Sequence, residues 1–477
     1  MMFYEMSIGN VMRPSDYVAQ KYHNYSLYVN QNRAIPDARD GLKSGQRIAL
    51  YIMRNKASKI KTIALAGEMI AKELYVHGDA AASESISQLA APYKNNVPLL
   101  SKQGNFGTLV KPGDFASPRY TYVQKPSYAN NLIYVDYDIV PMTENHDGSR
   151  EMPEYFLPLI PIALLNGVEG VGVGYRSRIM PRNLNDLANA VVKCIRGQKS
   201  ALPKMEPCFD YMNSQRGKFV KYNNNGGSVY EFRGSINIDS TSQVTVTNIP
   251  AMNITVESFK KKLDEMIEDG SIRDYEDHSS SSIKIVIKFR RGQLAKMSEE
   301  DILSYLGLIK EAAETLVVTR FDGQGIIQYQ YDKNEKYSDP VERYIREWVE
   351  WRFVKYMDRF KDLIQKANEE LLYLLCVKAC FDHSLPDRIS KKRDRADMKN
   401  DIIHCAKKSR LTATDEIADK ISARASYSWT KASYNELLEK IMKLQKDIKE
   451  YNSYLKSESK RKDLFVTEVT GLKSLKV

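Results

Sequence analysis

Arg119 and Tyr120 are the residues whose types and positions best suit them to take part in a chemical reaction. They end the run ASPRY (residues 116–120), which closely follows the run QGNFG (residues 103–107). A tyrosine hydroxyl ionises near pH ~10, so it is a weak nucleophile until a neighbour activates it. An adjacent guanidinium favours the phenolate and matches phosphate oxygens. We therefore expect Tyr120 to attack a phosphate, although in a chain with 30 tyrosines simple packing is the ordinary alternative.

Length and composition limit the classes of protein that fit. A chain of 477 residues is too long for one core and predicts about three domains. With 71 Lys and Arg against 60 Asp and Glu, the formal charge of +11 predicts a polyanionic partner. The most apolar run, residues 156–165, is too short for a membrane span, and no signal peptide is recognisable. The five cysteines and six histidines form no ligand cluster, which predicts a reduced, cytoplasmic protein with no metal site of its own.

Two helices joined by a short glycine turn are predicted upstream of the tyrosine. An apolar stripe that includes Ile63 and Ile70 predicts a helix over residues 60–73, and a similar stripe predicts a second over residues 80–90. His77 lies in the turn between them. This outline matches a helix-turn-helix, whose second helix enters the major groove of DNA, although helical hairpins are common.

A basic segment, RAIPDARDGLKSGQR (residues 33–47), precedes these helices. Proline and glycine predict a turn in it, flanked by four basic side chains: Arg33, Arg39, Lys43 and Arg47. A basic turn that leads into a helix suits phosphate binding, and an ordinary solvated loop is the alternative.

The remaining chain divides into three regions of different character. Residues 132–138 are predicted to form a strand, and the proline- and glycine-rich residues 151–174 a buried region of irregular strands and turns. Residues 184–330 then read as a separate α/β domain, with predicted helices at 184–195 and 256–268. Its predicted strands are residues 227–238, 243–249 and 282–289.

From residue 340 the pattern is helical and charged. Apolar residues spaced three or four apart continue to about residue 374, and a heptad seam covers residues 437–455. Two such helices separated by a compact insert predict an antiparallel coiled coil. The insert between them would be a small helical head, a candidate dimer contact.

Five motifs occur in one order along the chain: IPDARDGLKSGQR, YVHGD, QGNFG, ASPRY and LPLIPIALLNGVEGVGVG. In this order they resemble the DNA breakage-reunion subunit of type IIA DNA topoisomerases, the gyrase A-like family. The similarity is greatest to the cleavage core of the eukaryotic enzyme and to the medium subunit of T4-type phage topoisomerases. Five motifs in register are far more specific than any one of them, and they cover residues 33–185 strongly.

The resemblance implies an α+β multidomain protein. Residues 1–32 would form an N-terminal arm and residues 33–175 a winged-helix (CAP-like) DNA cleavage domain. Residues 176–335 would form a β-rich tower domain, and residues 336–477 a long antiparallel coiled coil. A small helical dimerisation head, the exit gate, would occupy about residues 376–428.

The resemblance also implies roles for single residues. Tyr120 would attack the scissile phosphate to leave a 5′-phosphotyrosine, and Arg119 would stabilise the transition state. Val171 falls where the family places an apolar wedge that enters between base pairs and bends the DNA. The remaining residues expected to contact DNA are Lys43, His77, Arg33, Arg47 and Gln103.

Cofactors and partners are implied in the same way. The sequence contains neither the acidic motifs of a TOPRIM domain nor the nucleotide loops of an ATPase domain. Mg²⁺ and ATP would therefore be held by a partner subunit, while this chain forms a homodimer on double-stranded DNA in the cytoplasm of a bacterial host. The alternative function is a non-catalytic winged-helix protein that shapes DNA. A tyrosine recombinase or relaxase is a weaker alternative, since its Arg and His constellation is not recognisable.

Overall fold

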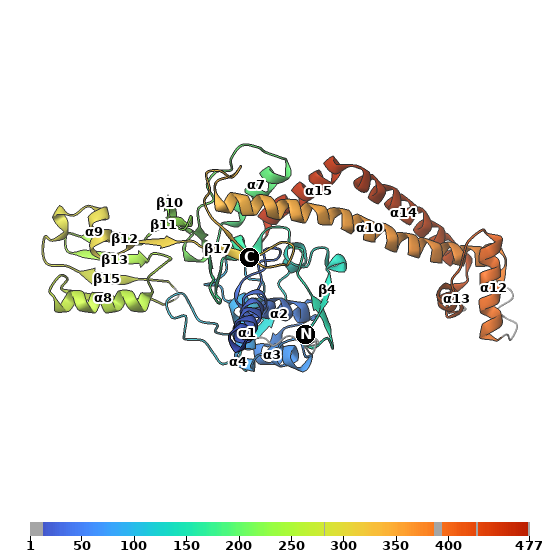
Figure 1. Ribbon diagram of the computed structural model, residues 1–477, viewed down its shortest axis with the longest axis horizontal. Coiled ribbons are helices and arrows are strands. Elements are labelled where there is room, and N and C mark those ends of the chain that lie inside the picture. Colours follow the sequence, from blue (N-terminus) through green and yellow to red (C-terminus); the bar gives the residue numbers. More distant parts are fainter. Residues whose placement is uncertain (1–12, 281, 386–393, 426–427, 476–477) are drawn as a thin grey trace. The chain divides into compact units, whose positions relative to one another are not determined.

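The computed structural model describes residues 13–280, 282–385, 394–425 and 428–475. The chain divides into two compact units (Figure 1). Unit 1 comprises residues 1–352 and 466–477, and unit 2 comprises residues 353–465. Helices and sheets are mixed, which confirms the α+β class.

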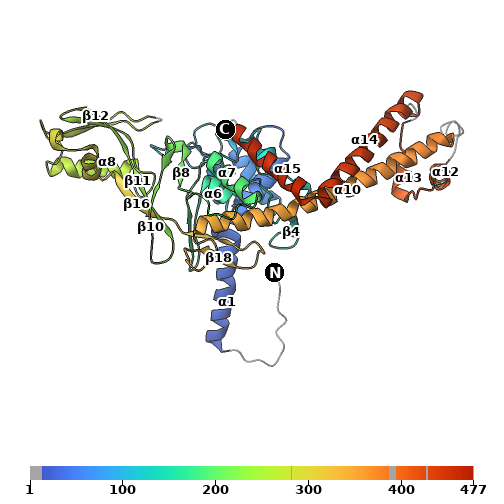
Figure 2. The same ribbon diagram turned by 90° about the horizontal axis from the view of Figure 1, so that it is seen from above.

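Unit 1 begins with a long helix that buries none of its residues. Helix α1 (Pro14–Val29) continues directly into the short π-helix η1 (Asn30–Ala34). It projects from the rest of the unit in Figure 2. The sequence predicted only an arm over residues 1–32 without regular structure, so this helix is a finding of the structure.

Three helices and a small sheet follow η1. The helices are α2 (Ser44–Arg54), α3 (Thr62–Ala71) and α4 (Asp79–Ala90). The antiparallel sheet has the order β1-β3-β2, with β1 (Ile60–Lys61), β3 (Tyr122–Gln124) and β2 (Ser101–Gln103). The two predicted helices are therefore confirmed with shifted bounds.

The predicted apolar stripe of Ile63, Ala66, Ile70 and Leu74 is confirmed in part, since Ala66 and Leu74 are buried. Leu65, Ala66 and Met69 are buried, whereas Ile63 and Ile70 are 36% and 38% exposed.

The middle of the basic segment, residues 34–42, is entirely buried, whereas Arg33 before it is exposed and Lys43 after it is half-buried, so the segment as a whole is neither an exposed nor a solvated loop. The Tyr344 hydroxyl donates to the carbonyl oxygen of Ala38 at 2.8 Å, and the Trp348 indole donates to that of Arg39 at 2.9 Å. A helix more than 300 residues away along the chain therefore covers this segment.

The predicted strand at residues 132–138 is wrong. Helix α5 (Ala129–Leu132) and the 3-10 helix η2 (Tyr137–Ile139) occupy this region instead. Asp136 between them has a φ of 55°, in the left-handed region, which interrupts an extended chain. The prediction of a buried, irregular region at residues 151–174 is confirmed in part. Residues 155–166 are all buried, but they end in a short helix, α6 (Ile162–Asn166), which lies between strand β5 (Glu151–Pro153) and a partly exposed hairpin.

That hairpin consists of β6 (Val168–Val171) and β7 (Arg176–Ile179). It follows α6 directly and leads to α7 (Leu184–Ile195). Strand β4 (Met142–Glu144) pairs separately with β5.

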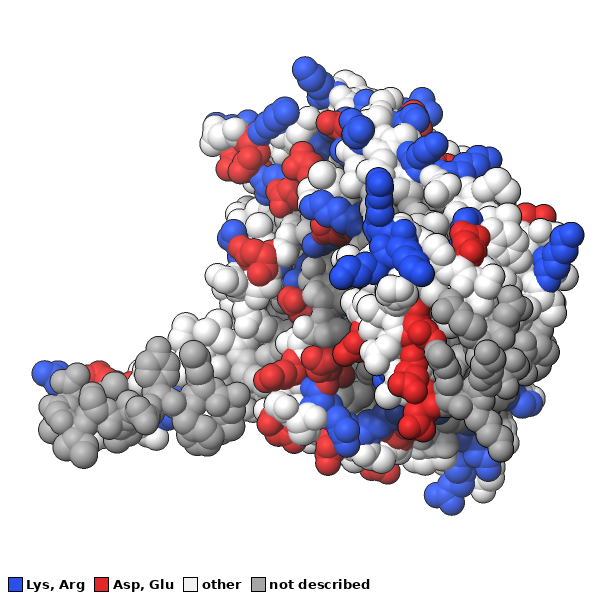
Figure 3. Space-filling model, turned by 90° about the vertical axis from the view of Figure 1, so that its right-hand side faces the viewer, with Lys and Arg blue, Asp and Glu red and all other residues white. Residues whose placement is uncertain are grey.

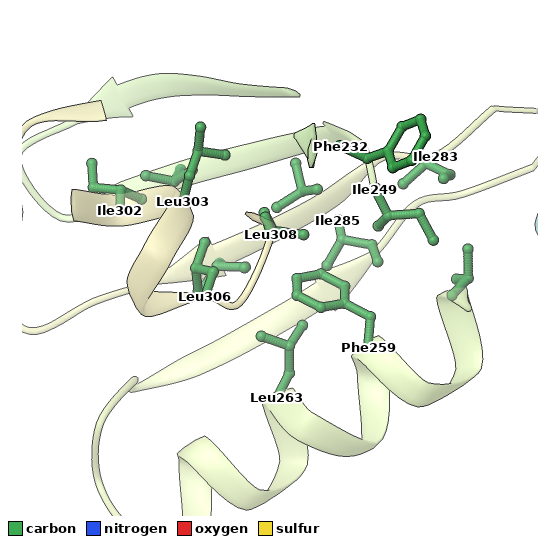
Figure 4. Packing of buried hydrophobic residues seen from close by; sticks show 14 of the residues in the cluster. Phe232, Ile249, Phe259, Leu263, Ile283, Ile285, Ile302, Leu303, Leu306 and Leu308 are labelled. Atoms are coloured by element: carbon green, nitrogen blue, oxygen red, sulfur yellow. The ribbon is translucent and has the colours of Figure 1, made fainter. Parts of the chain in front are cut away.

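The β-rich part of unit 1 contains sheets of order β10-β11-β16 and β12-β13-β15-β14 and the strand pairs β8-β9 and β17-β18. The bounds are β8 (Cys208–Phe209), η3 (Asp210–Met212), β9 (Gln215–Arg216), β10 (Lys218–Tyr222), β11 (Ser228–Arg233), β12 (Ser235–Ser240), β13 (Gln243–Asn248), α8 (Val256–Glu268), β14 (Asp274–Asp277), β15 (Ile285–Lys288), η4 (Leu294–Lys296), α9 (Glu299–Tyr305), β16 (Ile309–Ala313), β17 (Leu316–Thr319) and β18 (Ile326–Tyr329). Phe259 and Leu263 of α8 point toward the strand that carries Ile285 in the core of this part (Figure 4). The predicted helices at residues 184–195 and 256–268 are confirmed.

Unit 2 is helical. It contains most of α10 (Pro340–Asp382), then α12 (Arg395–Lys408), α13 (Asp415–Ser422), α14 (Lys431–Lys456) and the first part of α15 (Glu458–Gly471). The end of α15 and the 3-10 helix η6 (Leu472–Ser474) belong to unit 1. Within unit 2, Phe360 of α10 stacks on Tyr454 of α14 with ring centroids 4.5 Å apart. A separate cluster of buried residues that includes Cys376, Cys380 and Cys405 joins α10, α12, α13 and α14. Among the described residues, none of the helices is long and apolar enough to cross a membrane.

Candidate active site

Tyr120 lies in the connection between β2 and β3, two residues before β3 begins. Its side chain is 70% exposed, and Arg119 beside it is also exposed. Strand pairing places Gln103, the last residue of β2, opposite Tyr122 of β3. The two motifs that the sequence analysis singled out therefore meet at the same end of the sheet.

The N-terminus of α3 holds the tyrosine loop in place. The first N–H groups of a helix have no partner within the helix. Here the Thr62 N–H donates to the carbonyl oxygen of Thr121 at 3.0 Å, and the Ile63 N–H donates to that of Pro118 at 3.2 Å. These bonds fix the backbone on both sides of Tyr120 while its side chain stays exposed.

The side chains of Thr62 and Thr121 reinforce this attachment. Both residues are buried, and their hydroxyl oxygens lie 2.8 Å apart in a hydrogen bond. Replacing either threonine by valine leaves the other hydroxyl buried without that partner, which we expect to lower the free energy of unfolding by about 1–3 kcal/mol. The double variant Thr62→Val with Thr121→Val should recover most of the loss, because two apolar groups of the same shape then meet. Thermal unfolding of the three variants measures this, and additive losses would contradict the pairing.

Asn105 closes the loop that leads to Tyr120. Its amide nitrogen donates to the carbonyl oxygen of Asp114 at 2.9 Å, and its side-chain oxygen accepts from the Gly107 N–H at 2.9 Å. Gly107 has a φ of 86°, and a Cβ there would lie 2.7 Å from the carbonyl oxygen of Pro112. The second glycine of QGNFG is therefore required by the turn, and the asparagine between the glycines is a structural residue that sequence reasoning missed.

His77 and Arg33 lie close enough for their charges to interact, and Lys43 contacts the β6–β7 hairpin at Glu169. The Lys43 ammonium donates to the carbonyl oxygen of Glu169 at 2.6 Å, and burial lowers the pKa of Lys43. Burial, with a smaller effect of the Arg33 charge, lowers the pKa of His77 below its usual value. His77 also packs edge-on against Tyr75, with ring centroids 5.3 Å apart. A lowered pKa favours the neutral imidazole, a form that donates one hydrogen bond and accepts another.

Arg47 has an internal role that the sequence did not predict. Its guanidinium donates to Asp40 at 2.7 Å, and the carboxylate of Asp40 is fully buried. Arg39 pairs in the same way with Asp37 at 2.8 Å and Glu154 at 2.7 Å. These ion pairs stabilise the buried segment, and a phosphate contact by Arg47 stays a prediction.

Gln103 and Val171 are both exposed. The side-chain oxygen of Gln103 accepts from the Lys59 ammonium at 2.7 Å, which places an additional cation beside the tyrosine loop. Val171 is 78% exposed at the end of the β6–β7 hairpin. A β-branched apolar side chain held in water at a hairpin tip is poorly explained by packing within this chain.

Basic and acidic side chains are interspersed on the face drawn in Figure 3. In Figure 3, basic side chains gather near the middle of the face, with acidic side chains below and beside them. Within the described residues, no group of three or more His, Cys, Asp or Glu side chains is placed to hold a metal ion.

Comparison with known proteins decides the family. A model of the A-type chains of DNA gyrase and topoisomerase IV matches residues 33–470, most of the chain. The chain belongs to this family. It is therefore part of a DNA topoisomerase, an enzyme that breaks and rejoins DNA.

Two relatives show how far this topoisomerase subunit corresponds to known proteins. It is 30% identical to the DNA topoisomerase medium subunit of Enterobacteria phage T4 over 366 residues, which are 75% of this chain and 77% of the phage protein. It is also 30% identical to DNA topoisomerase 2 of Bombyx mori over 344 residues, 70% of this chain but 21% of the insect protein. The chain thus spans about a fifth of that eukaryotic relative.

Proposed function

We propose that Tyr120 is the nucleophile of this topoisomerase subunit. Its phenolic oxygen would attack a backbone phosphorus of double-stranded DNA while the bond to the 3′ oxygen breaks. The break then has a free 3′-hydroxyl on one side and a 5′-phosphotyrosine on the other. The proton lost by the phenol is balanced by the proton gained by the 3′ oxygen, and the reverse step reseals the strand. The observation that supports this most directly is the exposed Tyr120 on a loop fixed at both sides by α3.

Arg119 would stabilise the charge that develops on the phosphoryl oxygens. We expect Arg119→Gln to lower the rate of DNA cleavage about 10²- to 10³-fold, because a preorganised donor to a developing oxyanion is lost. The control Lys111→Gln removes an exposed positive charge from the same loop. Its cleavage rate should stay close to that of the unaltered protein, whereas equal losses in both variants would assign Arg119 to general DNA attraction.

DNA would be held by basic and polar side chains of unit 1. We propose a winged-helix arrangement in residues 33–175, in which Arg33, Lys43 and His77 contact backbone phosphates. Gln103 lies beside the tyrosine loop and would contact DNA there, and Arg47 would support this surface from behind. Val171 would act as an apolar wedge between base pairs, which bends the duplex.

Assembly follows the family resemblance. We propose a homodimer formed through the winged-helix region and through a helical head at about residues 376–428. This head would end an antiparallel coiled coil within residues 336–477, beside a tower at residues 176–335. The complex would act in the cytoplasm of a bacterial host.

A partner subunit would complete the enzyme. We propose that its TOPRIM domain holds Mg²⁺ and its ATPase domain binds ATP. The metal would stabilise the leaving 3′ oxygen. This chain's own residues would bind the duplex, orient the scissile phosphate and supply the nucleophile.

Strand passage tests the proposal. The chain is mixed with its partner subunit, Mg²⁺, ATP and catenated DNA circles. Release of single circles that depends on ATP and on both proteins is expected. The alternative, a non-catalytic protein that only shapes DNA, predicts bound and bent circles that remain catenated.

A further inference from the structure

Val171 lies at the tip of the β6–β7 hairpin, which has only two strands. Val171 pairs with Arg176 at the last position of the ladder, and the Gly172 N–H then donates to the carbonyl oxygen of Tyr175 at 2.8 Å. On the β7 side the hairpin is attached by the Arg178 N–H, which donates to the carbonyl oxygen of Thr315 at 2.9 Å, and by the Ser177 hydroxyl, which donates to that of Val317 at 2.8 Å. A two-stranded hairpin by itself is only marginally stable in water. The tip therefore needs a second attachment to resist a load.

Asn30 provides that attachment. Its side chain is buried although it lies at the start of η1, directly after the exposed helix α1. The amide nitrogen donates to the carbonyl oxygen of Val173 at 2.9 Å, and the amide oxygen accepts from the Val173 N–H at 2.7 Å. One side chain thus satisfies both backbone groups of a residue in the tip, as a neighbouring strand would.

Two glycines let the hairpin lie directly on η1. A Cβ at Gly170 would lie 2.0 Å from the carbonyl oxygen of Ala34, and a Cβ at Gly172 would lie 2.1 Å from the side-chain oxygen of Asn30. Because side chains alternate along a strand, Val171 points away from this contact. The glycine spacing therefore serves the close approach to η1 and leaves the valine free on the opposite face.

We propose that Asn30 is the positioning residue for Val171. This inference rests on the proposed function of Val171 as the wedge. When Val171 enters between two base pairs it unstacks them, and the stacked DNA opposes this with a force on the hairpin tip. Asn30 holds the tip against η1, so that the push opens the base step instead of moving the hairpin. Asn30 itself contacts no base and no phosphate.

The test measures DNA bending by energy transfer between dyes at the two ends of a duplex bound to the full chain with its partner and Mg²⁺. Asn30→Leu keeps the size of the side chain and removes both hydrogen bonds. It should lower the ratio of bent to unbent complex about five- to tenfold, in line with the loss of two hydrogen bonds. Asn30→Asp keeps the acceptor for the Val173 N–H and should give an intermediate loss. The matched control Asn145→Leu alters another buried asparagine, whose amide donates to the carbonyl oxygen of Glu73 at 2.8 Å, and should bend DNA normally.

A second readout separates positioning from general damage. The salt dependence of DNA affinity reports phosphate contacts. It should be the same for Asn30→Leu and the unaltered chain. A changed slope together with lost bending would overturn the inference, since it would mean that the DNA-binding surface itself had moved.

Gly172→Ala tests the same contact from the hairpin side and keeps the proposal testable if the Asn30 variants do not fold. Its Cβ needs the space that the Asn30 oxygen occupies, so it should reduce bending as Asn30→Leu does. Gly67→Ala, where a Cβ meets nothing within 4 Å, is its control. Normal bending by Gly172→Ala or by a folded Asn30→Leu would refute the positioning role. Normal bending by Val171→Ala would instead refute the wedge.

Discussion

Tyr120→Phe is expected to abolish the covalent link between this chain and DNA. Phenylalanine keeps the ring and removes the oxygen that would attack the phosphorus, so no 5′-phosphotyrosine can form. The side chain is 70% exposed, so the fold should not be affected. The measurement is the fraction of radiolabelled DNA that stays attached to protein after denaturation with detergent, with Mg²⁺ and the partner subunit present.

Tyr122→Phe is the matched control two residues further on. Tyr122 begins β3 opposite Gln103, and the Lys59 ammonium lies over its ring at 5.2 Å from the centroid. Its hydroxyl has no role in the proposed chemistry, so attachment should stay near the level of the unaltered chain. Attachment that survives in Tyr120→Phe and is lost in Tyr122→Phe would mean that the other hydroxyl is the nucleophile.

The largest loss of stability is expected for Glu314→Ala. Glu314 pairs with Arg182 at 2.6 Å, and the two side chains are 2% and 0% exposed. Burial alone would lower the pKa of Arg182, but the charge of Glu314 and its hydrogen bonds raise it, so the guanidinium stays charged. The glutamate also accepts from the Met180 N–H at 2.8 Å. Removing it leaves a buried, unpaired charge, which should lower the free energy of unfolding by about 3–5 kcal/mol.

Glu257→Ala is the control for this ion pair. Glu257 and Lys261 form an ion pair with both side chains largely exposed. Such pairs contribute about 0–1 kcal/mol, so the melting temperature should hardly change. A melting temperature of Glu314→Ala within the range of this control would show that water or a rearranged neighbour replaces the lost carboxylate.

Local patterns predicted some elements very well. Helices α7 and α8 have the predicted bounds, because each has a capping side chain at Asn183 or Thr255 and a single apolar face. The strand at residues 282–289 was recognised from its alternation, although β15 covers only Ile285–Lys288. These elements pack within their own part of the chain, so local spacing contains most of the information.

Local patterns failed where distant parts of the chain decide the structure. The segment of residues 33–47 reads as exposed because it is rich in charge. In the structure Tyr344 and Trp348 cover its buried part, residues 34–42, and Arg39 and Arg47 pair with internal carboxylates. The candidate nucleophile was found by its motif, because chemistry restricts the residue types there. Asn30 carries no such signal, since an asparagine that bonds to a distant backbone looks like any polar residue in a sequence.

The most direct test of the central claim is to locate the nucleotide on the protein. Cleavage complexes formed with Mg²⁺ and the partner subunit are trapped by denaturation, digested with nuclease and trypsin, and fragmented in a mass spectrometer. The account predicts a phosphodiester-linked nucleotide on Tyr120 alone. A nucleotide on Tyr122 or any other residue, or trapped DNA without a tyrosine adduct, would contradict it.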